Sequence, residues 1–77
     1  SNKAEVVVGD RKVSLYVDVL KRVQSRLATA GFYNGKIDAD YGQASIDAMK
    51  GFQRSIDFKA TGFPDQMTLW RLFRQAD

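Results

Sequence analysis

The sequence predicts a mainly α, compact three-helix domain with ordered loops, preceded by a short β-hairpin. Residues 1–17 are rich in β-branched side chains around a turn pair, and the apolar period changes at residue 18 from two to three or four. Two loops rich in Gly, Asp and Asn then separate the remaining apolar patterns. At 77 residues the chain forms one small domain at most.

The first segment reads "AEVVVGDRKVSLYV", in which Gly9-Asp10 suits a two-residue hairpin turn. Pairing about this turn places one set of residues on an apolar face: Ala4, Val6, Val8, Val13 and Leu15. Glu5, Lys12 and Ser14 fall on the other face. Because a lone hairpin is marginal in water, it must cover a helix of this domain or belong to a neighbouring one. We treat residues 1–17 as an N-terminal extension and residues 18–77 as the three-helix domain.

Three amphipathic helices follow. The first begins near residue 18, with Asp18 as the predicted N-cap, and ends before Gly31, which is suited to a left-handed C′ position. The second is predicted over residues 43–55 and contains Gly51, where we expect a close packing contact. The third is predicted over residues 66–75 with Asp65 as its N-cap. Predicted core positions are Leu20, Val23, Leu27, Ala30, Phe32, Ile46, Met49, Phe52, Phe58, Phe63, Leu69, Leu72 and Phe73. Trp70 fits either the core or a partly exposed stacking surface.

The composition excludes several classes of catalytic site. With no histidine and no cysteine, Ser-His-Asp and Cys-His pairs, the usual catalytic zinc sites and disulfides are impossible. A carboxylate pair acting as acid and base would need a cleft that so small a domain rarely forms. We therefore predict no enzymatic activity, no catalytic residue and no cofactor.

The stretch "KIDADYGQAS", residues 36–45, raises the question of a calcium loop. Counting from Asp38, Asp40 occupies the third ligand position, but Gly42 and Met49 stand where the fifth and twelfth ligands belong. We therefore predict no metal site. The two aspartates are assigned instead to hydrogen bonds within the loop or near the start of the next helix.

The net charge of +3 favours anionic partners, among them nucleic acid, acidic lipid and cell-wall polymer. The twelve Lys and Arg residues form no run of three, and the predicted loops of about eleven and nine residues are too long for a helix-turn-helix. We therefore predict no nucleic-acid binding. No stretch is apolar enough to insert in a membrane, no signal peptide is visible, and the opening Ser1-Asn2 suggests a piece of a longer protein.

The chain from Val19 to Phe73 resembles the peptidoglycan-binding-like domain family, a small three-helix module appended to many cell-wall enzymes. The motifs that carry the resemblance are "VQSRL" (23–27), "GFYNGKIDADYG" (31–42), "AM" (48–49), "FQ" (52–53) and "TGFPDQMTLWRL" (61–72). The family typically has Asp-Gly where this chain has Asp38-Ala39. If that glycine has a positive φ, alanine is strained there or the loop follows another path.

The resemblance implies a shallow groove for peptidoglycan around the loop between the first two helices. The residues expected to line it are Tyr33, Asn34, Lys36, Tyr41, Gln43 and Arg54. Tyrosine offers a flat face to sugar or methyl groups, Asn and Gln match peptide amides, and Lys or Arg pairs with stem-peptide carboxylates. The residues given structural roles are Gln24, Gly31, Gly42, Gln53, Asp65 and Thr68. Gln24 and Gln53 are expected to bond to loop backbone groups, and the hydroxyls of Ser45 and Thr68 to the loops before their helices.

Together these observations predict a non-catalytic bacterial cell-wall binding module. It would anchor or target a larger envelope protein or wall-processing enzyme in the periplasm or outside the cell. The alternative is a protein-interaction module on the same fold that no longer binds peptidoglycan and docks through the edge of the N-terminal hairpin.

Overall fold

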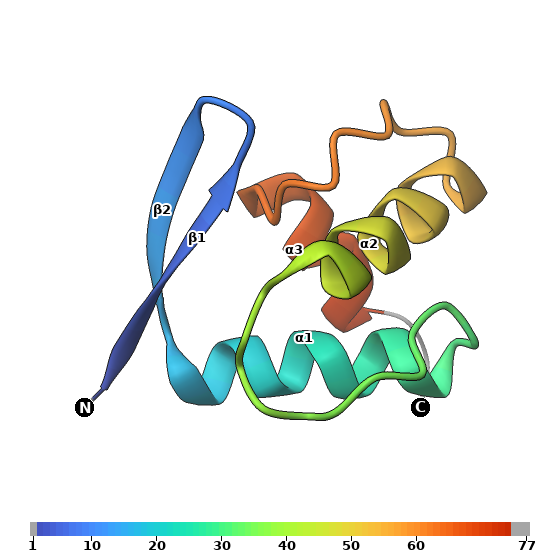
Figure 1. The fold of residues 1–77 in the computed structure, drawn as a ribbon. Helices are drawn as coiled ribbons and strands as arrows, with labels where there is room; N and C mark the ends of the chain where they lie inside the picture. The colour runs from blue at the N-terminus through green and yellow to red at the C-terminus, as the bar shows by residue number, and fades with distance from the viewer. Residues whose placement is uncertain (1, 75–77) are drawn as a thin grey trace.

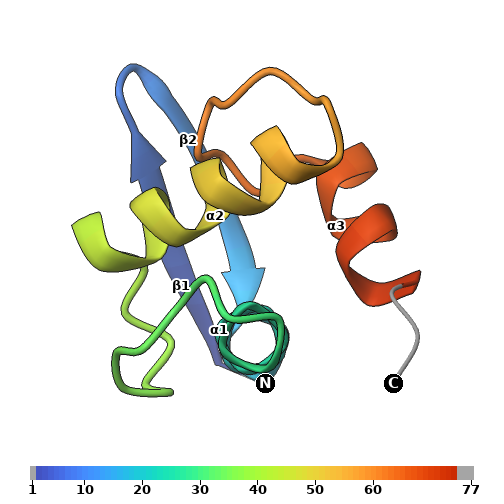
Figure 2. The ribbon, with the colours of Figure 1, turned by 90° about the vertical axis from the view of Figure 1, so that its right-hand side faces the viewer.

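The computed structural model describes residues 2–74. The elements are β1 (Lys3–Val8), β2 (Arg11–Tyr16), α1 (Val17–Thr29), α2 (Gln43–Ser55) and α3 (Gln66–Arg74). In Figure 1, α1 lies along the base, α2 and α3 lie above it, and the hairpin rises from the N-terminal end of α1. Figure 2 looks along α1, with the 30–42 loop on one side of this helix and α3 on the other. The predicted hairpin and three helices are confirmed.

The hairpin covers the core of this domain. Its two antiparallel strands pair Val6 with Val13 across the two-residue Gly9-Asp10 turn, the predicted register. Val6 is completely buried, and the other members of the predicted apolar face pack against the core: Ala4, Val8, Val13 and Leu15. At the turn end, the guanidinium carbon of Arg11 lies 4.0 Å from the centroid of the Phe63 ring. The first of the two alternatives predicted for the hairpin, that it covers this domain, is therefore correct.

Helix α1 begins one residue before the predicted cap. Tyr16 is the N-cap and makes no side-chain capping bond, so the prediction of Asp18 as the cap is wrong. Asp18 lies in the first turn instead, where the partial positive charge of the helix N-terminus favours a carboxylate. Antiparallel pairing extends into the helix start, because the N–H of Val17 donates to the Asn2 carbonyl at 3.0 Å.

The end of α1 follows the prediction. Gly31 has φ +89°, its N–H donates to the Ala28 carbonyl, and the N–H of Phe32 donates to the Leu27 carbonyl at 2.8 Å. These two bonds form a Schellman motif, which satisfies carbonyls that the helix end would otherwise leave unpaired. The chain thereby turns back along α1 into the 30–42 loop.

All five elements and the first loop contribute to one core. Its buried members are Val6, Leu20, Val23, Leu27, Tyr33, Ala39, Tyr41, Ala48, Met49, Phe52 and Leu72. Of the predicted core aromatics, Phe52 and Phe63 are buried, but Phe32 is 36% exposed and Phe58 is only partly buried. Phe32 packs edge-on against Phe52 and also covers Gly51, where an added Cβ would lie 3.1 Å from the Phe32 ring. The close contact expected at Gly51 is therefore present.

Helix α3 has the predicted N-cap. Asp65 accepts the N–H of Thr68 through Oδ1 at 2.8 Å and the Thr68 hydroxyl through Oδ2 at 3.0 Å. Leu72 is buried, and Leu69 and Phe73 pack against the core as expected. The structure places Trp70 outside the core, with 53% of its surface exposed. Gln75, predicted to end the helix, lies outside the described residues.

Candidate functional site

The 30–42 loop is held against α1 and α2 by the side chain of Gln24, which is completely buried. Its Oε1 accepts the backbone N–H of Asp38 at 3.0 Å and that of Ala39 at 2.9 Å. Its Nε2 donates to the Asp40 carbonyl and the Ser45 hydroxyl, both at 3.1 Å, and to the Asp38 carboxylate at 3.3 Å. We call this set of bonds the Gln24 clamp. The side-chain amide of Gln24 thus provides hydrogen-bond partners for backbone groups of residues 38–40. Its bond to Ser45 ties the same loop to the first turn of α2.

A second clamp, made by Gln53, holds the loop between α2 and α3. Its Oε1 accepts the N–H of Gly62 at 2.8 Å. Its Nε2 donates to the Thr68 hydroxyl at 3.1 Å and, at 3.2 Å, to the Phe63 carbonyl and the Thr61 hydroxyl. In both clamps the amide oxygen binds loop N–H groups, and the amide nitrogen binds a hydroxyl in the first turn of the next helix. The roles predicted for the two glutamines agree with these bonds.

The two clamped loops have different residues at one left-handed backbone position. Gly62 has φ +74°, and an added Cβ there would come within 2.6 Å of Ile46 Cγ2, so only glycine fits. Ala39 holds the corresponding place in the Gln24 clamp and has φ +66° with its side chain buried. Of the two possibilities considered for alanine, the structure therefore has the strained conformation and not another path for the loop.

Tyr33 and Tyr41 are only 8% and 7% exposed, so they offer little surface to a ligand. The Tyr33 hydroxyl donates to the Lys36 carbonyl at 2.6 Å, and the Tyr41 hydroxyl donates to the Gly62 carbonyl at 2.8 Å. Burial, with a smaller contribution from the charge of Asp65, raises the pKa of the Tyr41 hydroxyl far above its ordinary value. The Tyr41 bond therefore joins the two clamped loops as a proton donor throughout the neutral range.

The loop carboxylate of Asp38 is exposed and ionised. Its Oδ1 accepts the N–H of Asp40 at 3.0 Å, and this bond lowers the pKa of Asp38 below its usual value. Partial desolvation opposes the shift, and the bond from the Gln24 amide adds to it. Within residues 2–74 no three His, Cys, Asp or Glu side chains lie close enough together to hold a metal ion. Of the two aspartates in "KIDADYGQAS", Asp38 accepts a loop N–H through its carboxylate, and Asp40 takes part through its backbone N–H and carbonyl.

The other predicted groove residues are exposed: Asn34, Lys36, Gln43 and Arg54. Asn34 and Lys36 lie two residues apart in the clamped 30–42 loop. Gln43 begins α2, where its amide donates to Asp47 at 2.8 Å, whereas Arg54 lies in the last turn of the same helix. At 1.5 Å per residue the two positions are about 16 Å apart along the helix axis. The structure thus groups Asn34 and Lys36 and separates Gln43 from Arg54.

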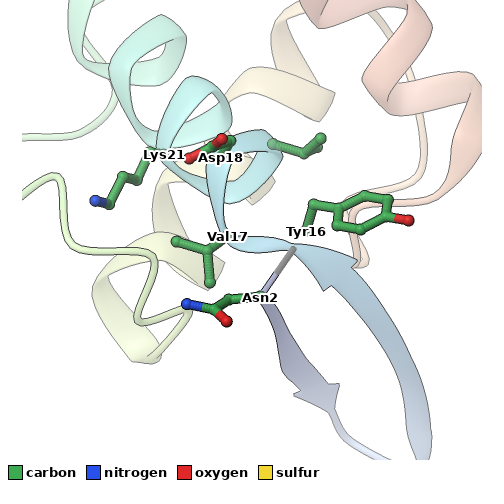
Figure 3. Close-up of a pocket in the computed structure, with 6 residues that line it drawn as sticks. Asn2, Tyr16, Val17, Asp18 and Lys21 are labelled. Carbon is green, nitrogen blue, oxygen red and sulfur yellow. The ribbon is translucent and has the colours of Figure 1, made fainter.

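A surface pocket of about 510 Å³ lies elsewhere, where the hairpin meets the start of α1. Figure 3 shows Lys21 and Tyr16 extending to opposite sides of this junction. The lining residues are Asn2, Tyr16, Val17, Asp18, Val19 and Lys21, and none of them is a predicted groove residue. The expected site is therefore an exposed loop surface and not this pocket.

Two glycines lie near the site. Gly42 is the N-cap of α2 with φ −93°, and a Cβ there would meet nothing within 4 Å, so the backbone does not require glycine at that position. At Gly35 the backbone closely approaches a side chain. A Cβ there would lie 2.6 Å from Cζ of the buried Tyr33 ring.

Sequence reasoning also missed two features. Asp57 takes the left-handed C′ position after α2, with φ +61°, and Phe58 donates to the Gln53 carbonyl in a second Schellman motif. The second is a group of arginine side chains that lie over aromatic rings around α3. An apolar period can locate a helix, but it does not show which arginine will reach a ring in another element.

Comparison with known proteins gives one family match, "Putative peptidoglycan binding domain", over residues 18–72. The chain is 35% identical over 60 residues to a spore cortex-lytic enzyme of Oceanobacillus iheyensis. The aligned segment covers 78% of this chain and 21% of that protein. The chain is 34% identical over 59 residues to the N-acetylmuramoyl-L-alanine amidase CwlM of Mycobacterium tuberculosis. That alignment covers 77% of this chain and 14% of that protein. No solved structure gives a significant match.

Both relatives are named as enzymes, but the chain spans only a small part of their length. None of the helices within residues 2–74 has the length and apolarity that a membrane span requires. The family match begins at residue 18, directly after the hairpin, and includes both glutamine clamps. The chain therefore belongs to the peptidoglycan-binding domain family.

Proposed function

We propose that this chain is a non-catalytic module that binds peptidoglycan and holds a larger envelope protein or wall-processing enzyme at the cell wall, in the periplasm or outside the cell. The observation that carries the proposal is that the loop with the exposed Asn34 and Lys36 is held in place by the Gln24 clamp and by the bond from the Tyr33 hydroxyl to the Lys36 carbonyl. A loop already fixed in the free protein loses little conformational entropy when it binds. Family membership supplies the class of ligand.

The contacts follow from the chemistry of the exposed groups. The Asn34 amide can pair with a stem-peptide amide, and the Lys36 ammonium with a stem-peptide carboxylate. Gln43 and Arg54, at opposite ends of α2, would contact separate parts of an extended strand. The buried tyrosines Tyr33 and Tyr41 support the loop from beneath. A dissociation constant of about micromolar to millimolar suffices, because tethering near a repeating polymer raises the effective concentration.

Co-sedimentation of the chain with purified sacculi tests the proposal. We expect the wild-type chain to sediment with sacculi, and Asn34→Ala/Lys36→Ala to weaken binding about tenfold without lowering the melting temperature. A matched control is Lys12→Ala/Ser14→Ala, which removes one lysine and one polar side chain from the outer face of the hairpin. A wild-type chain that stays in the supernatant at every salt concentration contradicts the proposal.

A second candidate, docking of a protein partner on the hairpin, is motivated by exposed apolar surface. Val7 and Tyr16 are 51% and 48% exposed, and the two-stranded sheet leaves an outer edge on each strand. Deleting residues 1–17 would not separate the two functions, because it would also remove the buried Val6. Val7→Thr/Tyr16→Ser changes only exposed side chains. Wall binding should survive this change. A wild-type chain that does not bind sacculi but binds a protein partner, with that binding lost in this variant, would favour the second candidate.

A further inference from the structure

The outward surface of α3 carries large apolar and cationic side chains together. Met67, Trp70, Arg71 and Arg74 follow one another at spacings of three, one and three residues, which places them on one stripe of the helix. Met67 is 59% exposed and Trp70 is 53% exposed. We call these four residues the α3 face. Figure 2 shows α3 and the 30–42 loop on opposite sides of α1, so this face is separate from the proposed loop site.

The arginines of the α3 face rest on aromatic rings. The guanidinium carbon of Arg74 lies 4.4 Å from the Trp70 ring centroid, and that of Arg71 lies 5.5 Å from the Phe58 centroid. Beside them, the guanidinium carbon of Arg22 on α1 lies 4.7 Å from the Phe73 centroid. Contact with a ring holds a guanidinium in place. Its N–H donors lie in the guanidinium plane and remain available for a carboxylate.

Within residues 2–74, no acidic side chain forms a salt bridge with an arginine of this face. Helix α3 itself, Gln66–Arg74, contains no Asp or Glu. A surface with an exposed indole and positioned guanidinium groups is complementary to an anionic ligand with flat apolar faces. A glycan that carries carboxylates has both features, since the C–H groups of a sugar ring can lie on an indole.

We infer that the α3 face is a second contact surface for an anionic glycan, in which a sugar ring stacks on Trp70 and carboxylates pair with Arg71 and Arg74. The inference rests on the proposed function, because peptidoglycan supplies both the sugar ring and the carboxylates. Two separate contact surfaces on one module would engage different units of the same polymer, and the second contact would then form at high effective concentration. A membrane surface fits less well, because the two exposed apolar side chains of this short helix share one stripe with two arginines and do not form a separate apolar face.

Trp70 provides a direct test, because it is the single tryptophan of the chain. The chain is titrated with soluble disaccharide–stem-peptide fragments released from sacculi, and tryptophan emission and acrylamide quenching are recorded. Covering Trp70 should shift its emission to shorter wavelength and reduce the quenching constant about twofold or more. The same shift should persist in Asn34→Ala/Lys36→Ala at higher fragment concentration. Saturated binding that leaves Trp70 emission and quenching unchanged overturns the inference.

Sacculus binding by variants provides the second test. Trp70→Ala should weaken binding about tenfold, because it removes the exposed aromatic surface on which the sugar ring stacks. Arg71→Gln/Arg74→Gln should weaken binding by a similar factor and reduce its salt dependence. The control Lys12→Gln/Lys21→Gln removes the same charge elsewhere and should have a smaller effect. All these side chains except Arg71 are exposed, and thermal melts check that each variant folds.

The outcomes separate the two proposals. If the wild-type chain does not bind sacculi, the proposed function fails and the inference fails with it. If the wild-type chain binds and the α3 variants bind equally well, the proposed function stands and only the inference fails. Vesicles containing phosphatidylglycerol complete the comparison. Arginine-dependent binding to vesicles, without any response of Trp70 to the glycan fragments, would assign the α3 face to lipid and overturn the inference.

Discussion

The side-chain oxygen of Gln24 accepts the N–H of Ala39 at 2.9 Å, and this bond holds an alanine at φ +66°. A left-handed conformation costs a non-glycine residue about 1–2 kcal/mol, while glycine costs about 0.4–1 kcal/mol of extra unfolded-state entropy. We therefore expect Ala39→Gly to leave stability unchanged or to raise it by up to about 1 kcal/mol, measured by urea unfolding.

A matched control for Ala39→Gly exists in α2. Ala48 is buried to the same extent, 4% exposed against 5%, but lies in a regular helix. Ala48→Gly should lose about 1 kcal/mol or more. Equal losses at the two positions would show that the conformation of Ala39 carries no strain.

Removal of the Gln24 side chain should be among the most damaging single changes. Gln24→Ala leaves the buried N–H of Ala39 without its partner and leaves the Ser45 hydroxyl with only the 3.5 Å bond to the Asp40 carbonyl. Each unsatisfied buried group costs about 1–3 kcal/mol, so we expect a loss of about 3 kcal/mol or more in chemical denaturation. Gln43→Ala is the control, because the exposed Gln43 bonds only to Asp47 and should cost less than about 0.5 kcal/mol. Similar losses for both glutamines would contradict a structural role for the clamp.

Tyr41→Phe removes the hydroxyl that joins the two loops and leaves the buried Gly62 carbonyl unpaired. The expected cost is about 1–2 kcal/mol, whereas Tyr16→Phe, at an exposed tyrosine, should cost almost nothing. Because folding raises the pKa of Tyr41, its contribution is complete below the unfolded value of about 10 and is lost as pH rises toward the higher folded value. The alkaline loss of stability should therefore be smaller in Tyr41→Phe, and an unchanged alkaline limb would refute this assignment.

The lowered pKa of Asp38 predicts a loss of stability at acidic pH, whereas the raised pKa of Tyr41 predicts one at alkaline pH. The pKa of Asp38 is lowered in the folded state, so its contribution is complete above the ordinary value of 3.8 and is lost as pH falls through the lower folded value. Urea unfolding between pH 6 and pH 2.5 should show stability falling in this range. The decrease should be smaller in Asp38→Asn, whose side-chain oxygen still accepts the Asp40 N–H. The same decrease in both proteins would mean that Asp38 does not contribute.

The hairpin should contribute to the stability of the whole domain. Val6 is completely buried and Val7, its neighbour in β1, is 51% exposed. Val6→Ala should cost about 2 kcal/mol, since it removes two buried methyl groups and leaves a cavity. Val7→Ala should cost less than about 0.5 kcal/mol. A similar small effect at both positions, in thermal or chemical unfolding, would show that the hairpin is only loosely attached.

Most of the framework was predictable from local sequence. The alternation in residues 3–16 and the Gly9-Asp10 turn define the hairpin register, because side chains in a strand alternate strictly between faces. The apolar period, Gly31 and Asp65 locate the helices and two of their ends. The predicted groove was less accessible to sequence reasoning. The same loop pattern contains the exposed Lys36 and the buried Tyr33, and only the packed fold distinguishes them.

The sequence by itself determined the order and type of the elements, the absence of histidine and cysteine chemistry, and the motifs of the family, because these depend on residues close together along the chain. Tertiary structure decided that the hairpin packs on this domain, that Ala39 is held in a left-handed conformation, and that Trp70 faces outward. Each of these depends on how segments that are far apart in the sequence pack against one another. For "KIDADYGQAS" the deciding partner is Gln24, whose amide lies on another helix.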